Sequence, residues 1–375
     1  MILLTARESR NRFLKVRNEA NSAEVRIRMD SPFLPHIDRM SGYTPGEQPR
    51  GGGVIKLNTN ENPYPPSPKA LEAMAKGLGE ALRKYPDPVG TDFRTAAASL
   101  HGVDPNMILA GNGSDDLLTI LTRAFVARGD AIAAPSPSYI LYKTLAEIQG
   151  ARIVEIPFRD DWTLDPERFS GTGARLAFLA NPNSPSGTVL APEAVAEIAG
   201  RLDVPLVVDE AYADFSPTHC VPLVKSHPNV IVTRSLSKGY SLAGLRFGYL
   251  IARPAIIEGL IKVKDSYNCD TLSLLGATAA LLDQPHFQRN RDAILATRRR
   301  LTTSLRELGF EVVESHANFV WCVNHPRAEA IYQGLKERRI LVRLMIYQGH
   351  QPGLRVTVGT DEEIDLFLNE LRAIL

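Results

Sequence analysis

Short apolar runs alternate with amphipathic runs through the middle of the chain. Apolar strands between helices are buried on both faces, so the alternation predicts a mostly parallel sheet covered by helices, an α/β fold. Ligands of such sheets bind beyond the carboxyl ends of the strands, and functional residues are therefore expected directly after each strand. The predicted strands are Met107–Ala110, Asp130–Pro135, Arg152–Pro157, Ala174–Ala180, Val204–Val208 and Val230–Val232.

Charge and cysteine content limit the possible classes of function. The 375 residues include 43 Lys and Arg against 42 Asp and Glu, which argues against a nucleic-acid or membrane-surface role driven by bulk charge. Cys220, Cys269 and Cys322 are far apart and show no metal-binding spacing. They are typical of free thiols in a reducing compartment, so we expect a cytoplasmic protein without a metal. The most apolar stretch, 242–261, is interrupted by charged residues and cannot span a bilayer.

Composition divides the chain into four expected parts. Residues 1–30 are rich in arginine and lack apolar periodicity, so we expect a disordered extension, with a targeting peptide as the alternative. Residues 31–66 are rich in proline and glycine, which is typical of an extended arm. A large domain is expected over 67–265 and a smaller α+β domain over 266–375.

Apolar residues at helical spacing predict helices on both sides of that border, and one of them, Glu258–Tyr267, is expected to link the two domains. The final hundred residues again alternate strands with helices, as in a small α+β domain. The other expected helices include Pro68–Lys84, Thr91–His101, Leu117–Val126, Leu272–Leu282, Phe287–Leu308, Ala328–Arg338 and one from Glu362 onward.

Lys238 stands among small residues after an apolar strand, and Arg246 follows eight positions later. A lysine amine that forms a Schiff base needs a tight, partly desolvated pocket, which lowers its pKa and frees its lone pair. An arginine fork suits a phosphate. Together they suggest pyridoxal 5'-phosphate (PLP), whose aldehyde takes the lysine and whose phosphate takes the arginine. The alternative is a surface lysine with an unrelated arginine.

Two other turns after strands carry chemistry. Gly111–Asp116 leads into an apolar helix, and the free N–H groups of a helix N-terminus bind anions, although Ser114 could serve only as an N-cap. Asp209 ends an apolar run, where an ionised carboxylate would keep the ring nitrogen of PLP protonated. A metal or surface role is the alternative for Asp209, but no histidine cluster accompanies it.

The stretch Ser235–Arg246 resembles the cofactor-lysine motif of fold-type I, PLP-dependent aminotransferases. From about Ser31 onward the chain is similar to the histidinol-phosphate aminotransferase family, including its Asn-Glu-Asn-Pro-Tyr signature at Asn60–Tyr64 and a further pattern at Tyr85–Pro88. The resemblance implies a fold-type I PLP-dependent transferase, in which a large domain holds the cofactor and a smaller one closes over the substrate. It also implies a homodimer, because the family builds each site from two subunits.

The resemblance implies a role for each matching residue. Lys238 would bind the cofactor aldehyde and move the substrate proton, and Tyr139 would stack on the cofactor ring. Asp209 and Tyr212 would bond the ring nitrogen and the phenolic oxygen. Cofactor-phosphate contacts are expected from Gly113, Ser114, Asp115, Ser235, Ser237 and Arg246, and from the partner subunit's Tyr64. Substrate contacts are expected from Tyr64, Asn318, Arg343 and Arg355, the two arginines being surface residues in the alternative interpretation.

One position departs from the family pattern. The family usually has two asparagines before the second proline of the segment that here is Asn181–Thr188, and the second of them bonds the phenolic oxygen of the cofactor. This chain has Asn183 followed by Ser184. Either the Ser184 hydroxyl donates this hydrogen bond, or Asn183 or Tyr212 replaces it.

The expected reaction is ping-pong transamination of histidinol phosphate with a 2-oxo acid acceptor, 2-oxoglutarate, in histidine biosynthesis. An aromatic amino acid aminotransferase is the nearest alternative, because the same scaffold and arginines accept phenyl rings. A PLP-dependent decarboxylase of a phosphorylated amino acid and a non-catalytic PLP-fold sensor are further alternatives. The sensor would need a DNA-binding module, for which residues 1–30 are too short and too aperiodic.

Overall fold

The computed structural model describes residues 31–42, 46–49, 52–323, 325–347 and 352–375. The extension expected over residues 1–30 lies outside these ranges. The chain divides into two compact units, one ending at Ser41 and one beginning at Gly42. The first contains a short helix, α1 (Pro35–Arg39), and the second contains every strand of the described residues.

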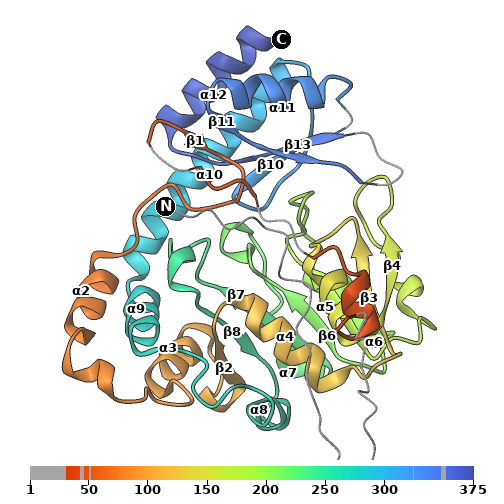
Figure 1. Cartoon of the computed structure of the whole chain (residues 1–375), viewed down its shortest axis with the longest axis vertical. Coiled ribbons are helices and arrows are strands. Elements are labelled where there is room, and N and C mark those ends of the chain that lie inside the picture. Colours follow the sequence, from red (N-terminus) through yellow and green to blue (C-terminus); the bar gives the residue numbers. More distant parts are fainter. Residues whose placement is uncertain (1–30, 43–45, 50–51, 324, 348–351) are drawn as a thin grey trace, which may run out of the picture. The chain divides into compact units, whose positions relative to one another are not determined.

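A seven-stranded sheet forms the base of the second unit (Figure 1). One strand, β8, runs antiparallel to its two neighbours and the others run parallel, which confirms the predicted mostly parallel sheet. The strands, in spatial order, are β2 (Ile108–Gly111), β8 (Gly248–Ile251), β7 (Val230–Ser235), β6 (Leu206–Asp209), β5 (Leu176–Ala180), β3 (Ala131–Ser136) and β4 (Arg152–Pro157).

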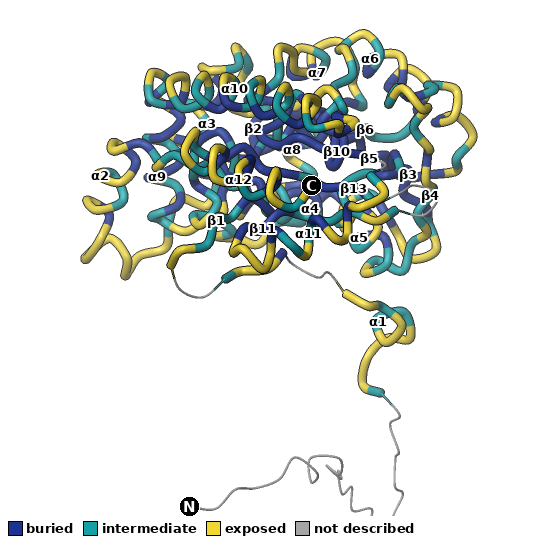
Figure 2. Tube along the Cα trace, turned by 90° about the horizontal axis from the view of Figure 1, so that it is seen from above, coloured by how far each residue is buried: buried dark blue, intermediate teal, exposed yellow. Residues whose placement is uncertain are grey.

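Helices cover both faces of this sheet because successive strand residues point in opposite directions. In β7, Val230 and Val232 join the hydrophobic cluster on one face and Ile231 joins the cluster on the other. The inner strands are accordingly mostly dark blue in Figure 2, the colour of buried residues, whereas the edge strand β4 is largely exposed or intermediate. One face packs against α3 (Thr91–His101), α6 (Pro192–Gly200), α7 (Leu223–Ser226) and α9 (Thr271–Leu282). The other face packs against α4 (Ser114–Phe125), α5 (Leu141–Gln149) and α8 (Pro254–Ile261).

A smaller antiparallel sheet follows, with the order β12 (Arg343–Met345), β13 (Gly353–Thr357), β10 (Phe319–Val323) and β9 (Glu311–Val313). It has a hydrophobic core of its own, to which α11 (Ala328–Glu337) and α12 (Asp361–Ile374) contribute. The fold therefore contains the expected C-terminal α+β part. A two-residue strand, β1 (Ile55–Lys56), pairs in parallel with β11 (Ile340–Leu341) and attaches the N-terminal segment to this part.

The helix that connects the two sheets is α10 (Gln284–Glu307). Its Phe287 belongs to a core of the large sheet, whereas Ile294 and Leu301 belong to the core of the small one. The prediction of a linking helix over 258–267 was wrong: α8 ends at Ile261, and its buried residues, Ile257 and Leu260, belong to a core of the large sheet. Residues 262–270, which include Lys264, Asp265 and Ser266, offer no continuous apolar face to extend it.

The predicted helix 68–84 is also shorter in the structure. Helix α2 (Pro68–Gly77) stops at Gly77, and Gly79 takes a φ of +99°, which glycine adopts without strain but which ends a helix. A single 3₁₀ turn, η1 (Glu80–Arg83), follows. Helix α9 follows residue 266, the expected start of the small domain, yet it packs along α2 and joins a core of the large sheet. The border between the two domains therefore stays a prediction.

Candidate active site

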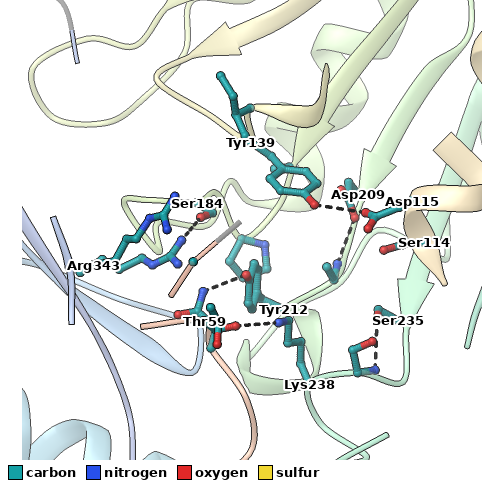
Figure 3. Close-up of a pocket in the computed structure, with 18 of the residues that line it drawn as sticks. Thr59, Ser114, Asp115, Tyr139, Ser184, Asp209, Tyr212, Ser235, Lys238 and Arg343 are labelled. Carbon is teal, nitrogen blue, oxygen red and sulfur yellow. Dashed lines mark hydrogen bonds between the residues drawn. The ribbon is translucent and has the colours of Figure 1, made fainter. Parts of the chain in front are cut away.

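A cavity of about 270 Å³ lies at the carboxyl ends of β5, β6 and β7, opposite β12, β13 and the segment around Thr59 (Figure 3). An α/β sheet is expected to bind its ligand at this edge. Most of the predicted site residues line the cavity. They are Ser114, Asp115, Tyr139, Ser184, Asp209, Tyr212, Ser235, Ser237, Lys238, Arg246, Arg343 and Arg355.

Lys238 follows β7, on a loop that turns back toward β8. Its Nζ donates a hydrogen bond to the carbonyl oxygen of Thr59 at 3.3 Å. The same Nζ lies 5.8 Å from the centroid of the Tyr212 ring. The amine is therefore held inside the cavity by a neutral acceptor and an aromatic face, and no carboxylate of the described residues forms an ion pair with it.

The first turn of α4 forms one end of the cavity. Gly113, with a φ of +87°, is the N-cap, and no described side chain caps the helix. Ser114 is the first helical residue, so the alternative in which it serves only as the N-cap is wrong. A Cβ at Gly113 would lie 2.8 Å from Nη2 of Arg246, so glycine is what lets the guanidinium approach this turn. Helix N–H groups beside a guanidinium make a site for an anion.

Two serines from the end of β7 complete this anion site. Ser235 and Ser237 line the cavity, and the backbone N–H of Ser237 donates to Oγ of Ser235 at 3.2 Å. Asp115 approaches Arg246 at 3.5 Å and accepts a hydrogen bond from the Tyr139 hydroxyl at 3.2 Å. Asp115 thus orients the arginine and the aromatic ring, both of which the sequence assigned to the same ligand.

Asp209 is buried at the end of β6, with 4% of its surface exposed. Burial raises the pKa of its carboxyl to about 6, whereas hydrogen bonds from Tyr142 and Thr233 lower it. The Tyr142 hydroxyl donates to Oδ2 at 2.9 Å, and Thr233 Oγ1 donates to Oδ1 at 3.2 Å. A carboxylate so placed, with no cation of the described residues paired to it, can receive a cationic ring nitrogen.

Tyr212 and Tyr139 supply two aromatic rings on the cavity wall. The Tyr212 hydroxyl accepts a hydrogen bond from Nδ2 of Asn60 at 2.9 Å, and its ring meets Phe319 edge-on at a centroid distance of 5.1 Å. Tyr139 meets Tyr142 in the same edge-on manner at 5.6 Å. Each ring thus packs edge-on against a neighbour that does not line the cavity.

Arg343 and Arg355 are directly opposite each other on β12 and β13. Like charges at facing positions repel, which favours an anionic ligand between or beside them. Nη1 of Arg355 donates to Oγ of Ser184 at 3.0 Å, and its Nη2 donates to the carbonyl oxygen of Asn58 at 3.2 Å (Figure 3 shows the first of these bonds). In this structure Ser184 therefore holds Arg355.

Asn183 does not line the cavity. Its Oδ1 accepts from the Ser138 hydroxyl at 2.7 Å, and its Nδ2 donates to the Pro137 carbonyl at 3.2 Å and to Oγ of Ser186 at 3.0 Å. These hydrogen bonds engage both ends of the Asn183 side-chain amide within its own region of the chain. Two of the three residues considered for the hydrogen bond to the phenolic oxygen of the cofactor, Ser184 and Tyr212, line the cavity, and Asn183 does not.

Asn318 and Tyr64 also lie outside the cavity lining. Asn318 is fully buried, and its Nδ2 donates to the carbonyl oxygen of Asn60 at 3.0 Å, so it supports the segment that faces the cavity. Tyr64 packs against the core of the small sheet. A role for Tyr64 in the site of a second subunit stays a prediction.

Several cavity residues were not assigned from the sequence. Thr59 directly precedes the quoted signature and Asn60 and Glu61 belong to it, yet only the tyrosine of the signature received a role. Tyr142, which lies outside the cavity lining, was also missed, because it acts only through its hydrogen bond to Asp209. Tyr347 closes the cavity near the arginines, and burial raises its pKa to about 12.

No helix among the described residues is long and apolar enough to cross a membrane. In the same residues no group of histidine, cysteine and carboxylate side chains is arranged to hold a metal ion.

Residues 52–371 match the class I and II aminotransferases, so the chain belongs to that family. Within it, the chain is 50% identical over 338 residues to a histidinol-phosphate aminotransferase of Rhodopirellula baltica, which covers 89% of this chain and 93% of the relative. It is 45% identical to histidinol-phosphate aminotransferase 1 of a Nostoc species, over 92% of this chain and 99% of the relative. These matches confirm the resemblance drawn from the sequence motifs.

Solved structures agree with the fold. A histidinol-phosphate aminotransferase from Sinorhizobium meliloti, solved in complex with pyridoxal-5'-phosphate, superposes with a TM-score of 0.84. It is 29% identical and covers 92% of this chain and 99% of its own. Aspartate aminotransferase from Thermus thermophilus, at 22% identity and a TM-score of 0.75, shares the fold over 86% of this chain and 92% of its own. The predicted fold-type I architecture is thereby confirmed.

Proposed function

We propose that the chain is a PLP-dependent aminotransferase that exchanges the amino group of histidinol phosphate for the oxo group of 2-oxoglutarate. The products would be imidazole acetol phosphate and glutamate, in histidine biosynthesis. The observation that carries the proposal is the convergence of Lys238, Asp209, the α4 anion site and two arginines on one cavity. The names of the relatives in R. baltica and Nostoc support the choice of substrate.

The residues present fit this cofactor. The α4 turn with Arg246 suits its phosphate, and Asp209, buried and without a cationic partner among the described residues, suits its ring nitrogen. Lys238 lines the same cavity (Figure 3). When bound, PLP withdraws electrons from the substrate Cα and makes its proton acidic.

Each side chain of the cavity would then have a separate role in the reaction. The Lys238 amine would accept the proton from the substrate Cα as a general base, and would deliver it as a general acid to the cofactor carbon that carried the aldehyde. Asp209 stays ionised and stabilises the positive ring nitrogen. Arg343 and Arg355 bind the substrate phosphate or the carboxylates of the amino donor and the acceptor, because a guanidinium fork matches both anions.

Glu61 favours an imidazole over a phenyl substrate. It lines the cavity, and its Oε2 accepts hydrogen bonds from Lys56 and Thr59. Burial raises its pKa, but the hydrogen bonds and charge of Lys56 outweigh this and leave the pKa below its usual value, so Glu61 is ionised at neutral pH. Its second oxygen makes no hydrogen bond to the described residues and can accept the N–H of an imidazole, which a phenyl ring lacks.

A homodimer in the cytoplasm is part of the proposal. Large apolar side chains are exposed on or next to α2, η1 and α9, and α2 packs along α9. Exposed apolar side chains that lie close together are typical of an interface. A dimer would also give Tyr64 the role that the family signature implies. The exposed side chains are Leu71, Leu78, Leu82, Tyr85, Tyr267, Leu275 and Leu282.

The test of the function is a single half-reaction. The PLP-loaded protein is mixed separately with histidinol phosphate, phenylalanine and a phosphorylated amino acid, without an acceptor, and the absorbance of the bound cofactor is followed. We expect conversion to the pyridoxamine form at least about tenfold faster with histidinol phosphate than with phenylalanine. Preference for phenylalanine would make the protein an aromatic aminotransferase, release of carbon dioxide would make it a decarboxylase, and no conversion would indicate a sensor.

A second expectation concerns Ser184. The Ser184→Ala variant loses the hydroxyl that accepts from Arg355, so we expect the KM for 2-oxoglutarate to rise about tenfold, the effect of about 1.4 kcal/mol, with a smaller change in kcat. Steady-state kinetics measures this, with Ser170→Ala, an exposed serine, as the control. An unchanged KM together with a shifted pH titration of cofactor absorbance would assign Ser184 to the cofactor instead.

A further inference from the structure

Residues 58–62 connect functional side chains of both sheets. The main-chain carbonyl of Asn58 accepts a hydrogen bond from Arg355 at 3.2 Å. The main-chain carbonyl of Thr59 accepts one from Lys238 at 3.3 Å. Asn60 bonds the hydroxyl of Tyr212 with its side chain and accepts from Asn318 with its carbonyl. The segment therefore sets the position of groups that belong to different parts of the fold.

Asn62 is the member of this segment that binds the lysine loop itself. Its Nδ2 donates to the carbonyl oxygen of Lys238 at 2.9 Å and to that of Gly239 at 3.2 Å. Its Oδ1 accepts from the backbone N–H of Tyr64 at 3.0 Å. Both ends of the amide are thus in use, and only a side chain with a donor and an acceptor at this length satisfies all three bonds.

The lysine loop is confined on its other side by a buried ion cluster. A Cβ at Gly239 would collide with the carboxylate of Asp214 and would lie 2.8 Å from the ring of Phe287. Asp214 is held by Arg234 at 2.8 Å, and Arg234 also binds Glu210 at 2.8 Å. The peptide that follows Lys238 is therefore fixed between Asn62 and Asp214.

We propose that Asn62 is a positioning residue for Lys238, which it holds through the backbone of the lysine loop. Asn62 does not line the cavity, so it acts on a ligand only through Lys238. The inference rests on the proposed function, because it concerns the bond between the lysine amine and an aldehyde. A displacement of about 1 Å at a reacting group can lower a rate by about 100-fold, so the loop needs such fixation.

The test uses the Asn62→Asp variant, which keeps the shape of the side chain but replaces the two N–H donors with an acceptor. Two ligands are compared in the full-length protein: PLP, and pyridoxine 5'-phosphate, which has a hydroxymethyl group in place of the aldehyde and cannot bond to the lysine. We expect the dissociation constant of PLP to rise about tenfold and that of pyridoxine 5'-phosphate to stay within about twofold. Asn369→Asp, which makes the same change at an exposed position, is the control.

The outcomes separate the inference from the proposed function. If both ligands weaken equally in Asn62→Asp, or if neither weakens, Asn62 does not position the lysine and the inference is overturned. If the unmodified protein binds PLP no more tightly than pyridoxine 5'-phosphate, Lys238 does not bond the aldehyde and the proposed function has failed. Should Asn62→Asp not fold, Asn62→Ser is measured in the same way, with the same two results deciding.

Discussion

Replacing Lys238 with alanine is expected to lower the transamination rate by at least about 10⁴-fold. The amine performs two functions in the proposed reaction, because it bonds the cofactor and then moves the substrate proton. Proton transfer by a positioned side chain alone contributes about 10²- to 10⁴-fold, and the loss of the covalent attachment adds to it. The groups that contact Nζ in the structure, the main-chain carbonyl of Thr59 and the ring face of Tyr212, offer no amine that could replace it.

Single-turnover kinetics with histidinol phosphate measures this effect, and borohydride reduction followed by peptide mapping locates the cofactor in the unmodified protein. Lys262→Ala removes an exposed lysine and serves as the control. Turnover that persists in Lys238→Ala would contradict the assignment of the lysine. Loss of turnover with retained binding of a ligand, but no covalent attachment in the unmodified protein, would favour a binding protein.

Replacing Asp209 with asparagine is expected to lower kcat by about 10²- to 10³-fold, the usual cost of removing a preorganised electrostatic group. The neutral amide cannot stabilise a positive ring nitrogen, so the cofactor withdraws electrons less strongly. Burial raises the pKa of Asp209 to about 6 in the free protein. The ionised fraction therefore falls below pH 6, and PLP affinity is expected to fall there by up to tenfold per pH unit.

Equilibrium binding of PLP between pH 5 and about pH 8 tests the second part of this expectation. The Asp209→Asn variant should lose the pH dependence near 6, because it has no proton to release at that position. Asp203→Asn, at an exposed site before β6, should retain it. An acid limb that survives in Asp209→Asn would assign the titration to another group.

The fold was predictable where the apolar pattern is local. Strands Arg152–Pro157 and Phe319–Val323 have the expected bounds. The second is a short run of side chains that the sheet buries completely, and the first is an edge strand whose Ile156 is buried. The pattern fails where a helix serves two cores. Helix α10 reads as one amphipathic helix in the sequence, and only the folded chain shows that Phe287 and Leu301 belong to different cores.

The site was predictable to the extent that its residues follow strands. Asp209 is the last residue of β6 and Lys238 follows β7 within a few residues, so the parallel sheet brings them to one edge. Asn62 and Tyr142 act through hydrogen bonds to residues 176 and 67 positions away in the sequence, and such pairings leave no local signal. Ser184 shows the same limit, because its partner is Arg355, on the other sheet.

The pairing of β1 with β11 has a consequence for synthesis of the protein. Strand β1 can pair only after Ile340, the partner of Ile55, has been synthesised. Strands β2 to β8, in contrast, are complete once residue 251 has been made. Chains fold from the N-terminus as they leave the ribosome, and contacts distant in sequence form last. The strands that carry Asp209 and precede Lys238 are thus made first, and the strands that carry Arg343 and Arg355, which we propose to bind the substrate, are made near the end of translation.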